Sequence, residues 1–251
     1  MEQVVCITGA TSGIGRATAG RFLKEGWQVV AVGRRAEKLA ELEQAHPGKV
    51  KGIALDVRDK ERVKRELAGL KAPFAPVDVL VNNAGLALGL EPAQEASLED
   101  WETMIDVNLK GLLYCTEALL PGMAKRGSGH VVNLGSIAGS YAYPGGNVYG
   151  ATKAFVEQFS RNLRCDLHGT GVRVTNVEPG LLETEFSLVR FKHDAAAAAA
   201  VYKGTDPLVA DDIADIIYWA CSRPARVDIC RVEVMPTCQS CGATRVYRKG
   251  E

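Results

Sequence analysis

The stretch Thr8-Gly9-Ala10-Thr11-Ser12-Gly13-Ile14-Gly15 follows an apolar run and leads into a helical pattern. Glycines in this strand–turn–helix context let the chain turn tightly and let the backbone approach a pyrophosphate, which then lies against helix N–H groups and the positive end of the helix dipole. A plain tight turn would not require three glycines at the spacing G-x-x-x-G-x-G. The stretch therefore predicts a dinucleotide site at the start of a βαβ unit.

Strand and helix patterns alternate along the rest of the chain. The short β-branched runs expected as strands are Val4–Thr8, Gln28–Val32, Val50–Leu55, Val77–Val81, His130–Leu134, Val172–Val177 and Arg231–Met235. The helical patterns cover Gly15–Glu25, Ala36–Ala45, Asp59–Leu70, Leu98–Lys125, Tyr149–His168 and Asp211–Cys221, the fourth opened by a capping-box-like Ser97 and Asp100. Strict alternation implies right-handed crossovers and a parallel sheet covered on both faces, so we expect one doubly wound α/β domain over residues 1–251.

Composition narrows the class of protein. The chain has 251 residues, 47% of them hydrophobic and 24% charged, and 30 basic residues balance 30 acidic ones. This balance excludes wholesale disorder and gives no electrostatic reason to expect nucleic acid or an anionic membrane as partner. No run approaches the roughly 18 apolar residues of a membrane span, and the amino end lacks a basic signal region. We therefore expect a soluble, cytoplasmic protein.

The 7 cysteines are scattered, which makes a disulfide framework improbable in a chain of this kind. Cys238-Gln-Ser-Cys241 has the spacing of half a zinc site or of a redox pair. A closed zinc site needs a second pair of ligands at comparable spacing, and the sequence shows none. An ordinary reduced pair and no metal is therefore the favoured interpretation.

One segment departs from the alternation of strand and helix. From Leu181 to Thr205 a long excursion precedes the last helix, and it contains the alanine run Ala195–Ala200, a good helix former. It could be a surface helix without a role. Its place just beyond the carboxyl end of a strand, where ligands bind in such sheets, favours a substrate lid over residues 183–205.

The end of the second strand distinguishes the two nicotinamide dinucleotides. An enzyme that uses NAD carries a carboxylate there to hold the ribose 2′-hydroxyl. This chain instead has Val32-Gly33-Arg34-Arg35, which removes the acid and adds two guanidinium groups suited to a 2′-phosphate. Both arginines could be solvated surface charges, but the missing acid and the gained bases together favour NADP.

Polar residues follow the third and fourth strands. Asp56 could accept a hydrogen bond from an adenine amino group. Asn82-Asn83-Ala84-Gly85 is either a strand-end turn or a cradle for the adenosine side of the cofactor. Taken singly, each of these features leaves both interpretations open.

Ser136, Tyr149 and Lys153 form the strongest constellation. Tyr149 and Lys153 are four residues apart and share one face of a helix, so a fixed ammonium is expected to lower the pKa of the phenol from about 10. Tyr149 could then exchange the alcohol proton while hydride moves to or from a nicotinamide, and the Ser136 hydroxyl could hold the reacting oxygen. A core tyrosine beside a lysine is the alternative, which the upstream glycine turn and serine make improbable.

These motifs resemble those of the short-chain dehydrogenase/reductase family from end to end of the chain. The matching pieces are Thr8–Gly15, Asp56-Val57, Asn82-Asn83-Ala84-Gly85, Asn108, Ser136, Tyr149-Gly150-Ala151-Thr152-Lys153 and Pro179-Gly180. The resemblance implies a Rossmann fold with a seven-stranded parallel sheet and usually a homotetramer. It also implies that Asn108, Ser136, Tyr149 and Lys153 are the catalytic residues.

Individual roles follow from the same resemblance. Asn108 would bend the fourth helix and hold a water that links Lys153 to bulk solvent, and Lys153 would also hydrogen-bond the nicotinamide ribose. Thr184 matches the residue that holds the carboxamide. The positions expected to contact the cofactor are Gly9, Thr11, Ser12, Gly13, Ile14, Gly15, Arg34, Arg35, Asp56, Val57, Asn83, Ala84, Gly85, Val107, Tyr149, Lys153, Pro179, Gly180 and Thr184.

A narrower resemblance concerns the substrate. The stretches Asn82–Gly89, Gly145–Tyr149, Asp166–Thr170 and Val189–Lys192 are similar to bacterial NADP-dependent 3-hydroxy acid dehydrogenases. That branch implies serine, L-allo-threonine or 3-hydroxypropionate as substrates and malonic semialdehyde as a substrate for reduction. The similarity weakens after about Met235, which puts C-terminal contacts in doubt.

A 3-hydroxy acid also presents a carboxylate, which an arginine in the lid could bind with two hydrogen bonds. Arg190 is the first candidate and Lys192 the second, although both could be surface charges or could bind cofactor phosphates. Ser136 and Tyr149 are the other residues expected to contact the substrate. A substrate amino group could meet Glu183 or Glu185.

Two other functions would share part of this sequence pattern. A reductase of another carbonyl class, such as 3-ketoacyl thioesters, would carry the same catalytic residues. A non-catalytic NADP-binding sensor is less probable, because it would be expected to have lost Tyr149 or Lys153. Leu112, Leu113, Leu119, Val156 and Phe159 could pack against a neighbouring subunit or lie in the core of the chain itself.

Overall fold

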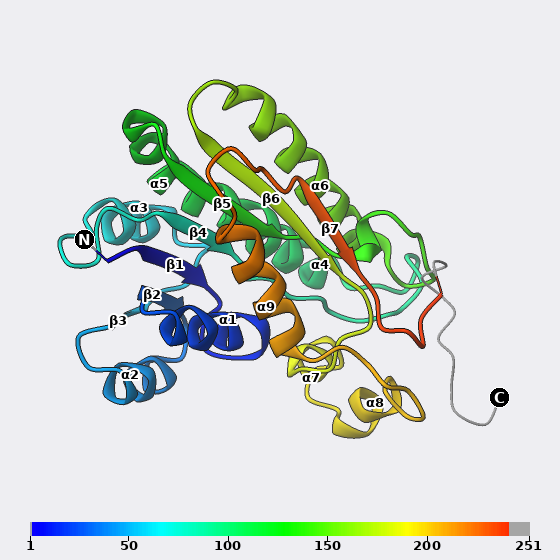
Figure 1. The fold of residues 1–251 in the computed structure, drawn as a ribbon. Helices are drawn as coiled ribbons and strands as arrows, with labels where there is room; N and C mark the ends of the chain where they lie inside the picture. The colour runs from blue at the N-terminus through cyan, green and yellow to red at the C-terminus, as the bar shows by residue number, and fades with distance from the viewer. Residues whose placement is uncertain (1, 241–251) are drawn as a thin grey trace.

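The computed structural model describes residues 2–240 and contains a sheet of seven parallel strands in the order β3-β2-β1-β4-β5-β6-β7 (Figure 1). The strands are β1 Val4–Thr8, β2 Gln28–Gly33, β3 Val50–Ala54, β4 Val79–Asn82, β5 Gly129–Leu134, β6 Val172–Pro179 and β7 Arg231–Val234. The strand order reverses between β1 and β4, and ligands bind at such a switch point beyond the carboxyl ends of the strands. The doubly wound Rossmann fold predicted from the sequence is confirmed.

Helices cover both faces of the sheet. They are α1 Gly13–Lys24, α2 Ala36–Ala45, α3 Lys60–Ala68, α4 Leu98–Ile105, α5 Leu112–Arg126, α6 Asn147–Asp166, α7 Phe186–Arg190, α8 Ala195–Ala200 and α9 Ala210–Cys221. One core cluster joins the sheet to α1, α2 and α9, and the other joins it to α3, α5 and α6. Among the residues described, no helix has both the length and the apolarity to cross a membrane.

The long helix expected over Leu98–Lys125 is interrupted. A π-helical segment, Asp106–Gly111, separates α4 from α5. Asn108 lies within this segment and is buried. Its side-chain amide bonds both the N–H and the carbonyl of Leu86, at 2.9 and 2.8 Å. Single-turn π segments in α-helices are frequent at functional sites. The family resemblance implied a bend at this position, and the structure has a π-helical interruption there.

Two further expectations about local structure are confirmed. Ser97 caps α4 by accepting a hydrogen bond from the Asp100 N–H at 3.2 Å. The alanine run forms α8, and the Asp194 carboxylate caps it by accepting from the N–H groups of Ala196 and Ala197. Residues 183–205 therefore hold two short helices, α7 and α8, beyond the carboxyl end of β6.

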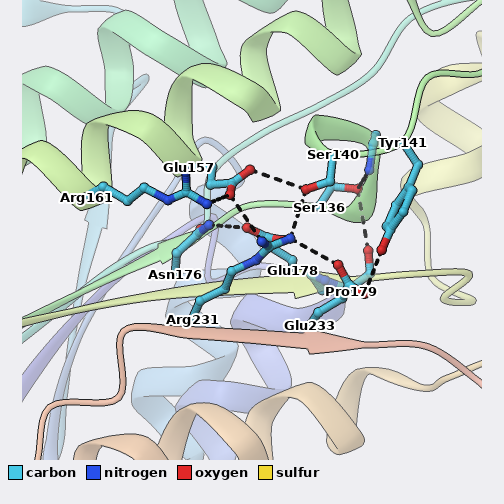
Figure 2. Close-up of polar contacts among 11 residues, drawn as sticks. Ser136, Ser140, Tyr141, Glu157, Arg161, Asn176, Glu178, Pro179, Arg231 and Glu233 are labelled. Atoms are coloured by element: carbon cyan, nitrogen blue, oxygen red, sulfur yellow. Dashed lines mark hydrogen bonds and ion pairs between the residues drawn. The ribbon is translucent and has the colours of Figure 1, made fainter. Parts of the chain in front are cut away.

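A polar network lies behind the turn that carries Ser136, at the β6–β7 edge of the sheet (Figure 2). Glu178, at the carboxyl end of β6, is 1% exposed and accepts hydrogen bonds from Asn176 Nδ2 at 2.5 Å and from Arg231 Nε at 2.9 Å. Arg231 also donates to the hydroxyl of Ser140 at 2.8 Å. The network thus joins β6, β7 and the turn after Ser136.

The Glu178 carboxyl titrates unusually in this network. Burial raises its pKa to about 7, an increase that hydrogen bonding and attraction from Arg231 reduce and that the nearby Glu157 and Glu233 enlarge. A carboxyl whose pKa is raised on folding stabilises the native state fully below its unfolded pKa. That contribution is lost as the pH rises through the folded pKa.

We expect Glu178→Gln to flatten the pH dependence of stability. Between about pH 4.5 and pH 7 the free energy of unfolding of the wild-type protein should fall relative to the variant, by up to about 1.4 kcal/mol per pH unit. Urea unfolding at pH 5 and pH 8 measures this difference. Glu61→Gln, which removes an exposed carboxylate on α3 away from this network, is the matched control and should follow the wild type; parallel curves for all three proteins would contradict the prediction.

Candidate active site

The glycine loop turns tightly between the end of β1 and the start of α1. Gly9 and Gly13 adopt positive φ angles of +69° and +48°. A Cβ on Gly15 would lie 2.3 Å from the Gly9 carbonyl oxygen and 2.5 Å from Asn83 Nδ2, so only glycine fits there. Together with Thr11, Ser12 and Ile14, these glycines form a backbone cradle at the carboxyl edge of the sheet. The tight turn expected from the glycine spacing is therefore present.

A threonine hydroxyl connects this loop to the one after β4. Thr8 Oγ1 accepts hydrogen bonds from the N–H groups of Asn83 and Ala84, at 3.0 and 2.9 Å. Asn83 Nδ2 donates in return to the Thr8 carbonyl at 2.8 Å. Sequence reasoning did not single out this role of Thr8. The only available signal was a hydroxyl residue at the last position of the strand.

The residues after β2 suit a 2′-phosphate. Arg35 Nε donates to Thr11 Oγ1 at 3.2 Å, and Arg35 Nη1 pairs with Glu185 at 3.0 Å. Arg34 is exposed beside it. A Cβ on Gly33 would lie 2.7 Å from Thr11 Cγ2, so a side chain at this position would require the Thr11 side chain to shift. Two guanidinium groups and no acid at position 33 fit NADP.

The expected adenine-side residues lie at the ends of β3 and β4. Hydrogen bonds from the Arg58 side chain lower the pKa of Asp56, and attraction from Arg34 lowers it further. Asp56 is therefore an ionised acceptor at neutral pH. Val57 packs against Gly111 of the π segment, where a Cβ would come within 2.6 Å of Val57 Cγ2. Val107, also in that segment, is buried in the core.

Tyr149, Ser136 and Lys153 meet at the carboxyl end of β5. Tyr149 and Lys153 are both buried on α6, and the Ser136 side chain hydrogen-bonds Tyr149. The Ser136 hydroxyl also lies 3.4 Å from the Pro179 carbonyl (Figure 2). Lys153 Nζ donates to the Leu134 carbonyl at 2.7 Å and lies 5.8 Å from the centre of the Tyr149 ring. The structure thus brings together the three residues that the sequence predicted.

The predicted lowering of the Tyr149 pKa by Lys153 is wrong for this structure. Burial raises the pKa of Tyr149 to about 12, although attraction from Arg190 and the hydrogen bond from Ser136 oppose the increase. Burial also lowers the pKa of Lys153 to about 8. The ammonium is directed at the Leu134 carbonyl, so desolvation dominates the ionisation of the phenol.

Asn108 and Gly85 complete the interior of the site. Asn108 Nδ2 donates to Thr152 Oγ1 at 3.1 Å, and Thr152 Oγ1 donates to the Tyr149 carbonyl at 2.7 Å. Asn108 therefore connects the π segment to the helix of Tyr149. A Cβ on Gly85 would lie 3.3 Å from Asn108 Oδ1 and 3.6 Å from Lys153 Nζ, which places Gly85 between these two side chains.

The segment after β6 contacts both the glycine loop and Tyr149. Gly180 donates its N–H to the Val234 carbonyl at 2.7 Å, and Thr184 lies against Gly13, where a Cβ would be 3.4 Å from Thr184 Cβ. The Phe186 ring lies 5.7 Å from that of Tyr149, measured between centroids. The Arg190 guanidinium lies 5.0 Å from the centre of the Tyr149 ring. Sequence reasoning missed Phe186 because no spacing rule connects it to Tyr149.

Other charged residues of this segment are bound elsewhere. Lys192 Nζ pairs with Asp100 on α4 at 2.8 Å, which makes it a poorer candidate than Arg190 for binding substrate. Glu185 pairs with Arg35 and Glu183 is exposed.

Within residues 2–240 no group of three or more His, Cys, Asp or Glu side chains could hold a metal ion. Cys238 Sγ lies 3.3 Å from the Asp206 carbonyl, and Cys241 lies outside the described residues.

Comparisons with known proteins agree with this geometry. A family model described as short chain dehydrogenase matches residues 3–194. The NADP-dependent 3-hydroxy acid dehydrogenase YdfG of Salmonella typhi is 54% identical over 98% of this chain and 100% of its own. The serine 3-dehydrogenase of Rhizobium radiobacter is 52% identical over 99% of this chain and 100% of its own.

Solved structures give the same result. The closed form of serine dehydrogenase complexed with NADP+ superposes with a TM-score of 0.95 at 52% identity, over 98% of this chain and 100% of that one. Serine dehydrogenase from Escherichia coli superposes with a TM-score of 0.84 at 48% identity, over 95% of this chain and 100% of that one. The chain belongs to the short-chain dehydrogenase family.

Proposed function

We propose that this protein is an NADP-dependent oxidoreductase that interconverts the 3-hydroxyl and 3-oxo groups of short 3-hydroxy acids, such as serine, L-allo-threonine and 3-hydroxypropionate. The observation that carries the proposal is the position of Arg190. Its guanidinium lies 5.0 Å from the Tyr149 ring, so a cation suited to a carboxylate adjoins the proton-transfer residue. The names of the relatives above support the same class of substrate.

Bound NADP would supply the hydride acceptor of the reaction. The backbone of Gly9, Gly13 and Gly15 would hold the pyrophosphate, and Arg34 and Arg35 the 2′-phosphate. The remaining contacts would come from Asp56, Asn83, Lys153 and Thr184, as the family resemblance implies. Arg35 already hydrogen-bonds Thr11 of the glycine loop, which places its guanidinium beside that loop.

Proton transfer falls to Tyr149, with Ser136 holding the reacting oxygen. A phenol with a pKa of about 12 is protonated at neutral pH, which suits donation to the developing alkoxide during reduction. In the oxidative direction the phenol must first lose its proton, and the positive charge of Arg190 favours that loss. Lys153 and Asn108 would hold α6 in position. Lys153 bonds the Leu134 carbonyl at the end of β5, and Asn108 bonds the Thr152 hydroxyl on α6.

The reaction class is tested by initial rates of nicotinamide absorbance with L-serine, L-allo-threonine and 3-hydroxypropionate, each with NADP and with NAD. We expect turnover with NADP and a loss of about 10²–10⁴-fold in kcat for Tyr149→Phe, because the variant lacks the exchangeable proton. Tight NADPH binding without turnover of any of these acids would instead favour a reductase of another carbonyl class, such as 3-ketoacyl thioesters.

Arg190→Ala tests the carboxylate contact. We expect kcat/KM for 3-hydroxy acids to fall about 100-fold while KM for NADP is unchanged, because truncation removes a charge-assisted pair to the substrate and the cation that favours ionisation of Tyr149. Lys192→Ala is the matched control, since this neighbouring cation is held by Asp100. Equal effects of the two substitutions would remove Arg190 from the substrate site.

We also infer a cytoplasmic homotetramer, as is usual in the family. Leu112, Leu119 and Val156 are buried within the chain itself, which leaves the half-buried Leu113 and Phe159 as candidates for a subunit contact. Sedimentation should show a particle of four 26.9 kDa chains. A stable monomer would contradict this assembly.

A further inference from the structure

Tyr143 lies beside Arg190 at the entrance to the site. It precedes α6, and its hydroxyl accepts a hydrogen bond from Arg190 Nη2 at 3.2 Å. Its ring occupies the space beside Gly146, where a Cβ would lie 2.6 Å from Tyr143 Cε1. The missing side chain at position 146 therefore allows the ring to rest directly on the backbone, with its hydroxyl directed at Arg190.

Arg190 is held in place but is incompletely bonded. Its carbonyl accepts from the Gly89 N–H at 3.0 Å, and its guanidinium lies over the rings of both Tyr149 and Phe186, at 5.0 and 5.2 Å from their centres. Arg190 Nε is buried and has no hydrogen-bond partner among residues 2–240. Buried donors are normally paired, so this N–H has an unused capacity to bond an acceptor on a ligand.

The Tyr143 hydroxyl has a complementary capacity. It uses one lone pair to accept from Arg190 and retains its own proton, so it can donate to a second acceptor close to the guanidinium. A carboxylate offers two oxygens and about four acceptor positions. It could therefore receive the free Nε–H of Arg190 on one oxygen and the Tyr143 proton on the other.

We propose that Tyr143 is a substrate-positioning residue that orients the Arg190 guanidinium and donates its hydroxyl proton to the same substrate carboxylate. This inference rests on the proposed function and names the group that the site selects. A neutral ester or thioester lacks the negative charge that strengthens hydrogen bonds from a guanidinium, so it would bind these two donors more weakly. The pair therefore favours free acids over esters and thioesters of similar size.

Tyr143→Phe tests this role, because the variant keeps the ring on Gly146 and loses only the hydroxyl. We expect KM for the 3-hydroxy acid to rise about tenfold, equivalent to about 1.4 kcal/mol, with kcat and KM for NADP within about twofold of wild type. Tyr141→Phe is the matched control, since the hydroxyl of this nearby tyrosine donates instead to Glu233 at 3.2 Å. It should leave the KM for the acid unchanged.

Calorimetric binding of malonate to the NADPH-loaded protein provides a second readout that does not depend on turnover. We expect Tyr143→Phe to weaken malonate binding about tenfold and Tyr141→Phe to leave it unchanged. Wild-type turnover of 3-hydroxy acids, with the same KM and the same malonate affinity in Tyr143→Phe, would overturn the role of Tyr143 and leave the proposed function intact. Wild-type protein that neither oxidises these acids nor binds malonate would overturn both.

Discussion

The close packing of the glycine loop against the loop after β4 is the constraint on which the site depends. Gly15 has the Gly9 carbonyl and the Asn83 amide where a side chain would otherwise lie. Thr8 completes this packing, because its hydroxyl accepts from two consecutive N–H groups of the β4 loop. These contacts fix the relative positions of the carboxyl ends of β1 and β4. The cofactor cradle on one side and Gly85, beside Lys153, on the other both follow from them.

Burial controls the ionisation of Tyr149 and Lys153, the candidate catalytic residues, more than any single charge does. Tyr149 and Lys153 are both removed from water, and each shifts toward its neutral form. The only cation that moves the phenol in the opposite direction within the described chain is Arg190, from α7. The segment that we assign to substrate binding therefore also affects the ionisation of the proton-transfer residue.

Sequence patterns predicted the parts of this structure that depend on local rules. Glycine spacing, β-branched runs and the four-residue interval between Tyr149 and Lys153 are local, and they led to the fold class, the glycine loop and the candidate catalytic residues. The interruption of Leu98–Lys125 was not apparent from periodicity, because it depends on bonds between Asn108 and the distant Leu86. The contacts of Tyr143 and Phe186 with Arg190 and Tyr149 were missed for the same reason, since only the fold brings these segments together. The ionisation of Tyr149 was predicted with the wrong sign because burial cannot be read from a four-residue spacing.

The short segment from Thr184 to Lys192 contacts several separate parts of the molecule. Thr184 lies against Gly13 of the glycine loop, and Glu185 pairs with Arg35 after β2. Arg190 lies over the ring of Tyr149, and Lys192 pairs with Asp100 in the first turn of α4. Transplanting this segment from a relative with another substrate would therefore also exchange contacts to the cofactor side. An engineered change of substrate is better sought by single replacements within the segment, or in the loop before α6, than by exchange of the whole segment.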